Sequence, residues 1–155
     1  MQKSSAIAFK QLLKTSGIRL LQERMEAAER AMQEAQEAAN NEEKSSAGDK
    51  YETARSMSQL DKEMNARQLE AARQQLQHLQ QVNVDSGQDT FVVGSVARIG
   101  GQYYFLSVGL GSIQLEGRKV WYLSPQAPLS KVLFQKQAGD TVLFQGKNST
   151  IEEVF

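Results

Sequence analysis

The chain has 155 residues, enough for one ordinary domain or two small ones. Lys and Arg total 18, as do Asp and Glu, so the formal net charge is zero, which argues against indiscriminate nucleic-acid binding through a basic field. The absence of Cys excludes disulfides and thiolate metal sites. No secretory signal pattern and no run of about 18 apolar residues occurs, so we expect a soluble cytoplasmic protein with no membrane partner.

Composition changes abruptly near Val82, and this change predicts two domains. From Gly17 to Gln81 the chain is dominated by Ala, Glu, Gln, Arg and Leu, which are strong helix formers. After Val84 it becomes rich in Gly, Val, Tyr, Phe and Leu and contains both Pro residues. We therefore expect a helical domain over residues 1–82 and a mainly β domain over residues 83–155.

The helical domain begins with a short amphipathic segment, residues 7–13, which we expect Thr15-Ser16-Gly17 to end or kink. A long helix is then predicted from about Ile18 to Ala39, because apolar residues recur alternately four and three apart, as in a coiled-coil seam. The residues of this predicted seam are Leu21, Met25, Ala28, Met32, Ala35 and Ala39.

A polar turn at about residues 40–52 separates this helix from a second one, predicted from about Asp49 to Gln81. The second helix has two apolar seams, and the gap of five between Met64 and Leu69 predicts an irregularity near Arg67. The two seams are Met57, Leu60 and Met64, then Leu69, Ala72, Leu76 and Leu79. The short turn favours an antiparallel intramolecular hairpin, hence a monomer, with its tip on the order of 40 Å from its base.

The β domain is predicted as short strands separated by Gly-rich turns, with a short helix after Pro128. The predicted strands are 90–99, 103–108, 112–115, 119–123, 141–144 and 151–155, with a turn at 146–148. The predicted core residues are Val92, Val96, Phe105, Val108, Val120, Tyr122, Val142 and Phe144. The fold class is therefore α+β: an N-terminal antiparallel helical hairpin followed by a small antiparallel sheet with one short helix.

Two acidic residues stand at the start of the second helix. Asp49 and Glu52 are three residues apart, so both carboxylates lie on one face if the helix begins near Asp49. The same residues also fit an ordinary helix cap resembling a capping box. Capping and a functional role are compatible, and both interpretations stay open at this point.

Two motifs resemble the Gre transcript-cleavage factors of bacterial RNA polymerase. Gly48-Asp49-Lys50-Tyr51-Glu52 is similar to the Gly-Asp-x-x-Glu of that family's coiled-coil tip. Residues 128–142, Pro-Leu-Ser-Lys-Val-Leu-Phe-Gln-Lys-Gln-Ala-Gly-Asp-Thr-Val, are similar to the family's Pro-Leu-x-Arg/Lys-x-Leu-x-x-Lys-x-x-Gly-Asp-x-Val. The second motif is the longer and more specific one. The order of a helical hairpin and then a small FKBP-like β domain agrees with the family as well.

The resemblance implies a factor that binds bacterial RNA polymerase at its secondary channel and stimulates the polymerase's own cleavage of a backtracked RNA 3′ end. The chain would be no enzyme alone and would bind no cofactor alone, sharing Mg²⁺ with the polymerase active site. Asp49 would stabilise the metal, and Glu52 would position the ion or a water. The implied polymerase-binding residues are Ala127, Pro128, Leu129 and Lys131.

Several positions depart from the family pattern. Thr53 stands where the family has Asn, residues 55–58 replace its aromatic and basic residues, and Ala127 replaces Ser. These differences keep open a Gre-like regulator or inhibitor that binds polymerase without stimulating cleavage. Two alternatives from other classes are a working prolyl isomerase in the β domain and a coiled-coil adaptor that dimerises through residues 21–39.

Overall fold

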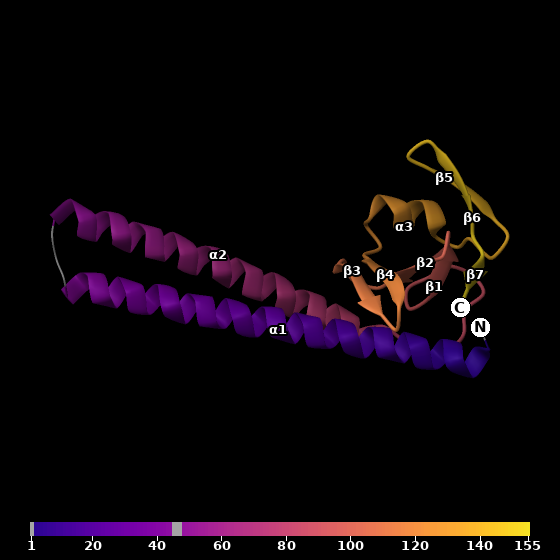
Figure 1. Ribbon diagram of the computed structural model, residues 1–155, viewed down its shortest axis with the longest axis horizontal. Helices are drawn as coiled ribbons and strands as arrows, with labels where there is room; N and C mark the ends of the chain where they lie inside the picture. Colours follow the sequence, from indigo (N-terminus) through magenta and orange to yellow (C-terminus); the bar gives the residue numbers. More distant parts are fainter. Residues whose placement is uncertain (1, 45–47) are drawn as a thin grey trace. The chain divides into compact units, whose positions relative to one another are not determined.

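The computed structural model describes residues 2–44 and 48–155, and the side chains of residues 42–51 lie outside the described part. Two long helices, α1 (Lys3–Lys44) and α2 (Gly48–Gln81), precede a sheet domain with one short helix, α3 (Pro128–Leu133) (Figure 1). The predicted α+β class, a helical hairpin followed by a small sheet domain, is confirmed. The first long helix extends farther toward the turn than predicted, because the polar residues 40–44 are helical, whereas α2 begins close to its predicted start.

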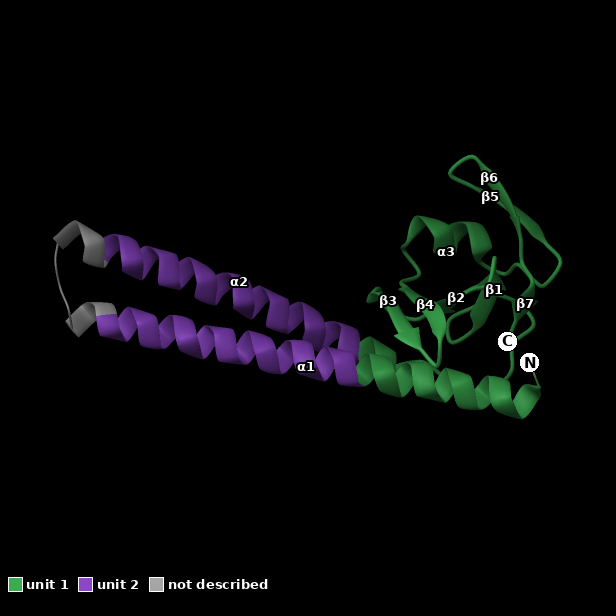
Figure 2. Cartoon of the chain, in the orientation of Figure 1, with its two compact units in different colours: residues 1–18, 77–155 green, residues 19–76 purple. Residues whose placement is uncertain are grey.

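The chain forms two compact units (Figure 2). One contains residues 1–18 and 77–155, and the other contains residues 19–76. The first unit therefore takes in the start of α1 and the end of α2 together with the sheet, whereas the change of composition falls at residue 82. The second unit is the helical hairpin.

The α1 seam of the hairpin unit is confirmed. Leu21 and Ala28 are buried, and the other predicted seam residues are half-buried. Lys62 Nζ on α2 donates a hydrogen bond to Gln36 Oε1 on α1 at 2.9 Å.

The predicted first seam of α2 is wrong. Met57, Leu60 and Met64 are 57%, 58% and 49% exposed. The inward positions follow one unbroken pattern of four and three, and polar residues occupy several of them. These inward residues are Ser58, Lys62, Asn65, Leu69, Ala72 and Leu76. The helix is uninterrupted through Arg67, so the predicted irregularity there is also wrong.

Gly17 does not end or kink a helix as predicted, because α1 runs continuously through it. A Cβ at this position would lie 2.8 Å from Leu79 Cδ2 and 3.0 Å from Tyr122 Cε2. Thr15 stays within the helix by donating its Oγ1 hydrogen bond to the carbonyl of Gln11 at 3.0 Å. The glycine is therefore required by close packing.

The main sheet has the strand order β3-β4-β2-β1-β7. Only the β2–β4 pair is parallel, and the other pairs are antiparallel, so the predicted antiparallel sheet holds with this one exception among the described strands. The strands are β1 (Val96–Ile99), β2 (Gln102–Leu106), β3 (Gly111–Leu115), β4 (Arg118–Leu123) and β7 (Glu153–Val154).

A separate antiparallel hairpin consists of β5 (Thr141–Phe144) and β6 (Lys147–Thr150). The turn predicted at residues 146–148 is wrong in its position, and β6 was not predicted. The turn lies at Gln145 and Gly146, both with positive φ (51° and 76°), and pairing resumes at Lys147. Gln145 adopts a left-handed conformation that is sterically unfavourable for a residue other than Gly, Asn or Asp. Because Gln is not a typical residue for such a turn, the amino-acid sequence hardly indicates a turn at this position.

One face of the sheet packs on the start of α1. The Phe9 ring lies 5.5 Å from the Tyr103 ring, and Tyr122 Oη donates a hydrogen bond to the Leu13 carbonyl at 2.6 Å. Lys14 Nζ donates to the carbonyl of Gln80, in the last turn of α2, and to that of Val82, just after the helix. The amphipathic segment 7–13 therefore belongs with the sheet.

The opposite face supports a second core between the sheet, α3 and the β5–β6 hairpin. Its buried members are Phe91, Ala97, Leu106, Leu133, Val142 and Ile151. Successive residues of β2 face opposite sides, so Tyr103 and Phe105 face α1 while Leu106 belongs to the second core. Of the predicted core residues, Val92 and Phe144 are half-buried and the remainder are buried.

Candidate functional site

Asp49 and Glu52 lie at the start of the second long helix, as predicted. Because α2 begins at Gly48, Asp49 and Glu52 fall in its first five residues. Glu52 is exposed, and the side chain of Asp49 lies outside the described residues, as does its predicted metal contact. A helix N-terminus carries a partial positive charge that favours nearby carboxylates, so this position suits both acids.

The chemistry of this pair fits a shared Mg²⁺ ion. Mg²⁺ takes six oxygen ligands in near-octahedral geometry and is commonly bound by one or two carboxylates together with waters and substrate phosphates. Asp49 and Glu52 are three residues apart in the sequence, which is the spacing of neighbours on one helical face, and of the two only Glu52 has a described side chain. No cluster of three or more His, Cys, Asp or Glu side chains suited to a metal is found among the described residues.

The start of the second motif builds α3. Ala127 is the N-cap residue in extended conformation (φ −60°, ψ 141°), and Pro128 occupies the first helical turn, where its missing N–H leaves no bond unmade. Leu133 is fully buried in the second core, and Leu129 packs against that core. These residues therefore have a folding role as well as any binding role.

The end of the motif closes the turn before β5. Gly139 has φ 92°, and Asp140 Oδ2 accepts a hydrogen bond from the Gln137 amide at 2.9 Å. Val142 is then buried in the second core. Folding thus accounts for the Gly-Asp-x-Val portion of the motif.

The motif also presents an exposed surface. Pro128 and Lys131 are exposed, and Ala127 and Leu129 are half-buried. Phe134 at the end of α3 is 49% exposed, a feature that the sequence analysis did not single out. An apolar side chain such as this one is usually a core residue. In the structure Phe134 follows the last residue of α3, and its side chain is not part of the buried face of that helix.

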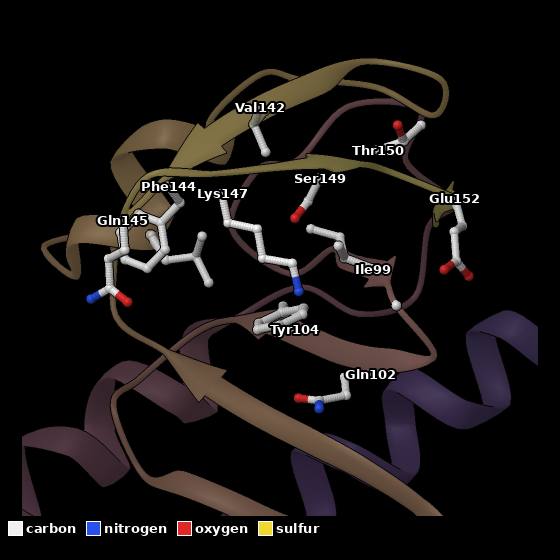
Figure 3. A pocket seen from close by; sticks show the side chains of 12 residues that line it. Ile99, Gln102, Tyr104, Val142, Phe144, Gln145, Lys147, Ser149, Thr150 and Glu152 are labelled. Atoms are coloured by element: carbon white, nitrogen blue, oxygen red, sulfur yellow. The ribbon is translucent and has the colours of Figure 1, made fainter.

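A cavity of about 720 Å³ lies between the main sheet and the β5–β6 hairpin (Figure 3). Its apolar lining comes from four elements: β1, β2, α3 and β5. The apolar lining residues are Ile99, Tyr104, Leu129, Val142 and Phe144. No sequence pattern indicates this cavity, because its lining residues are distant in the chain and one wall is formed by the β5–β6 hairpin.

Polar interactions fix the side chains around the cavity. Arg98 Nε lies 2.9 Å from Glu152 Oε2 in an ion pair, and the Gly101 amide donates to Glu152 Oε1 at 3.3 Å. Trp121 Nε1 donates to Gln102 Oε1 at 2.7 Å, and the Trp121 side chain is half-buried in β4. Burial raises the pKa of Tyr104 above its ordinary value.

Comparisons with protein-family models, curated proteins and solved structures find no match to this chain. The resemblance to the Gre family consequently depends on the two motifs and on the order of the domains. Within the described part of the chain, neither long helix combines the length and apolar character needed to cross a membrane.

Proposed function

We propose that this chain is a Gre-type transcription elongation factor. It would bind bacterial RNA polymerase at the secondary channel and stimulate the polymerase's Mg²⁺-dependent cleavage of backtracked RNA. One observation carries the proposal: the Gly-Asp-x-x-Glu motif opens the second helix of a long hairpin, in a chain whose sheet domain contains the second motif. We further propose that the protein is monomeric and cytoplasmic and that it is not an enzyme by itself.

The tip carboxylates would act inside the polymerase. A second Mg²⁺ ion bound there would polarise the scissile phosphate and lower the pKa of a water. Asp49 would supply an oxygen ligand that the polymerase lacks. Glu52, on the same helical face, would orient the water or the ion through its exposed carboxylate.

The sheet domain would provide the docking contacts. Pro128 and Lys131 are exposed on α3, with half-buried Ala127 and Leu129 beside them. An exposed Lys next to apolar groups suits a protein surface that contributes both a carboxylate and apolar contact. Phe134 adds an aromatic side chain at the same end of the helix.

The proposal is tested by RNA cleavage in stalled, backtracked elongation complexes carrying 3′-labelled RNA. We expect the intact protein to accelerate release of short 3′ fragments, and Asp49→Asn and Glu52→Gln each to lower the stimulated rate about tenfold or more. Glu63→Gln is the matched control, because Glu63 is exposed on α2 away from its first turn. This control should retain full stimulation.

The alternative is a Gre-like regulator that binds polymerase without stimulating cleavage. Thr53 and residues 55–58, which differ from the family pattern beside the tip, favour it. Intact protein that displaces a labelled cleavage factor from polymerase, yet produces no fragments, would contradict the cleavage proposal and support the regulator. Failure to bind polymerase would contradict both.

A further inference from the structure

We propose that the cavity beneath the β5–β6 hairpin binds a small amphipathic carboxylate, with its apolar body against the sheet and its anionic group at Lys147. The size of the cavity, its apolar lining and its charges support this ligand class. The inference concerns the sheet domain alone and goes beyond the proposed action of the tip carboxylates.

The size and lining favour a small organic ligand. Pockets for small molecules typically enclose about 300–1,000 Å³ and are mostly apolar with a few polar groups, and this cavity has about 720 Å³. Tyr104 and Phe144 provide aromatic surfaces, and Ile99 and Val142 provide branched aliphatic ones. An apolar chain or ring would gain dispersion contacts and lose hydrated surface there.

The charges favour an anion. Lys147 on β6 lines the cavity, and its ammonium has no hydrogen bond or ion pair within the described part of the chain. Figure 3 shows its side chain extending from the hairpin toward Tyr104. The acidic residue of the lining, Glu152, has one carboxylate oxygen near Arg98 and the other accepting from the Gly101 amide.

Arg98 lies 2.9 Å from Glu152 and 3.9 Å from Glu153, so its charge is shared between two carboxylates. Lys147 has no ion partner among the described residues and lies beside the apolar lining. A ligand carboxylate could accept a charge-assisted hydrogen bond from Lys147 Nζ. Ser149 and Thr150, from the same strand, add hydroxyl groups to the lining. A cationic ligand would face repulsion from Lys147, and a neutral apolar one would gain no charge-assisted hydrogen bond from its ammonium.

The test is an NMR titration of the full chain, labelled with ¹⁵N, using 4-phenylbutyrate as the probe and 4-phenyl-1-butanol as its neutral counterpart. We expect phenylbutyrate to shift the amide signals of Ile99, Tyr104 and Val142 most strongly. The alcohol should bind about fivefold more weakly, a difference typical of one exposed ion pair.

Two lysine variants provide the matched comparison. Lys147→Gln should weaken phenylbutyrate binding about fivefold and leave alcohol binding unchanged. Lys136→Gln is the control, because Lys136 is exposed in the same domain and does not line the cavity. Equal affinity for the two probes, equal binding by both variants, or shifts centred outside the cavity would each overturn the proposal.

Discussion

Replacing Gly17 with Ala sets two effects of similar size against each other. In an exposed helix interior, Ala is more favourable than Gly by about 1 kcal/mol. At Gly17, however, the new methyl would lie 2.8 Å from Leu79 Cδ2 and 3.0 Å from Tyr122 Cε2, closer than ordinary contact. Leu79 and Tyr122 are 0% and 2% exposed, so neither side chain has free space into which to move.

Overpacking of this kind costs about 1–3 kcal/mol, so we expect Gly17→Ala to lower the unfolding free energy by about 1 kcal/mol net. Urea denaturation followed by Trp121 fluorescence measures this change in the sheet domain. Ala8→Gly provides the control, because Ala8 is exposed in the same helix and should report the propensity effect alone. Stabilisation of Gly17→Ala by about 1 kcal/mol would refute the packing argument.

Burial raises the pKa of Tyr122 above its ordinary value of 10.0, so the unfolded chain loses this proton first and the unfolding free energy should fall as pH rises above 10. Tyr122→Phe should reduce that pH dependence and cost about 1 kcal/mol at neutral pH, measured by urea denaturation. Leu60→Gln should change the unfolding free energy by less than about 0.5 kcal/mol, whereas Leu21→Ala should cost about 2–4 kcal/mol in circular-dichroism melts, because only Leu21 is buried. Lys131→Ala should leave stability unchanged and weaken polymerase binding about fivefold in a competition assay.

Sequence reasoning succeeded where apolar residues mark the packed positions. The α1 seam was predicted correctly because its inward positions are all occupied by Leu, Met or Ala residues. It failed in the first half of α2, because Ser58 and Asn65 occupy inward positions while Met57 and Leu60 lie outside. Apolar periodicity places the methionines and leucines of this segment on the inward face of α2, but that face is exposed in the structure.

Other features depend on contacts between distant parts of the chain. The role of Gly17 needs the positions of Leu79 and Tyr122, and a glycine in the sequence alone indicates a helix end. The cavity needs the β5–β6 hairpin, which in turn depends on the left-handed conformation of Gln145. The start of α2 just before Asp49, by contrast, follows from local turn signals and was predicted.

The most direct test of the proposed mechanism is the Mg²⁺ dependence of transcript cleavage in backtracked complexes. If the tip carboxylates complete the shell of a weakly held ion, intact protein should lower the Mg²⁺ concentration that gives half-maximal cleavage. Asp49→Asn should abolish this shift even at saturating protein, and Glu63→Gln should preserve it. An unchanged midpoint with intact protein, or a shift that survives Asp49→Asn, would contradict the assignment of the tip carboxylates.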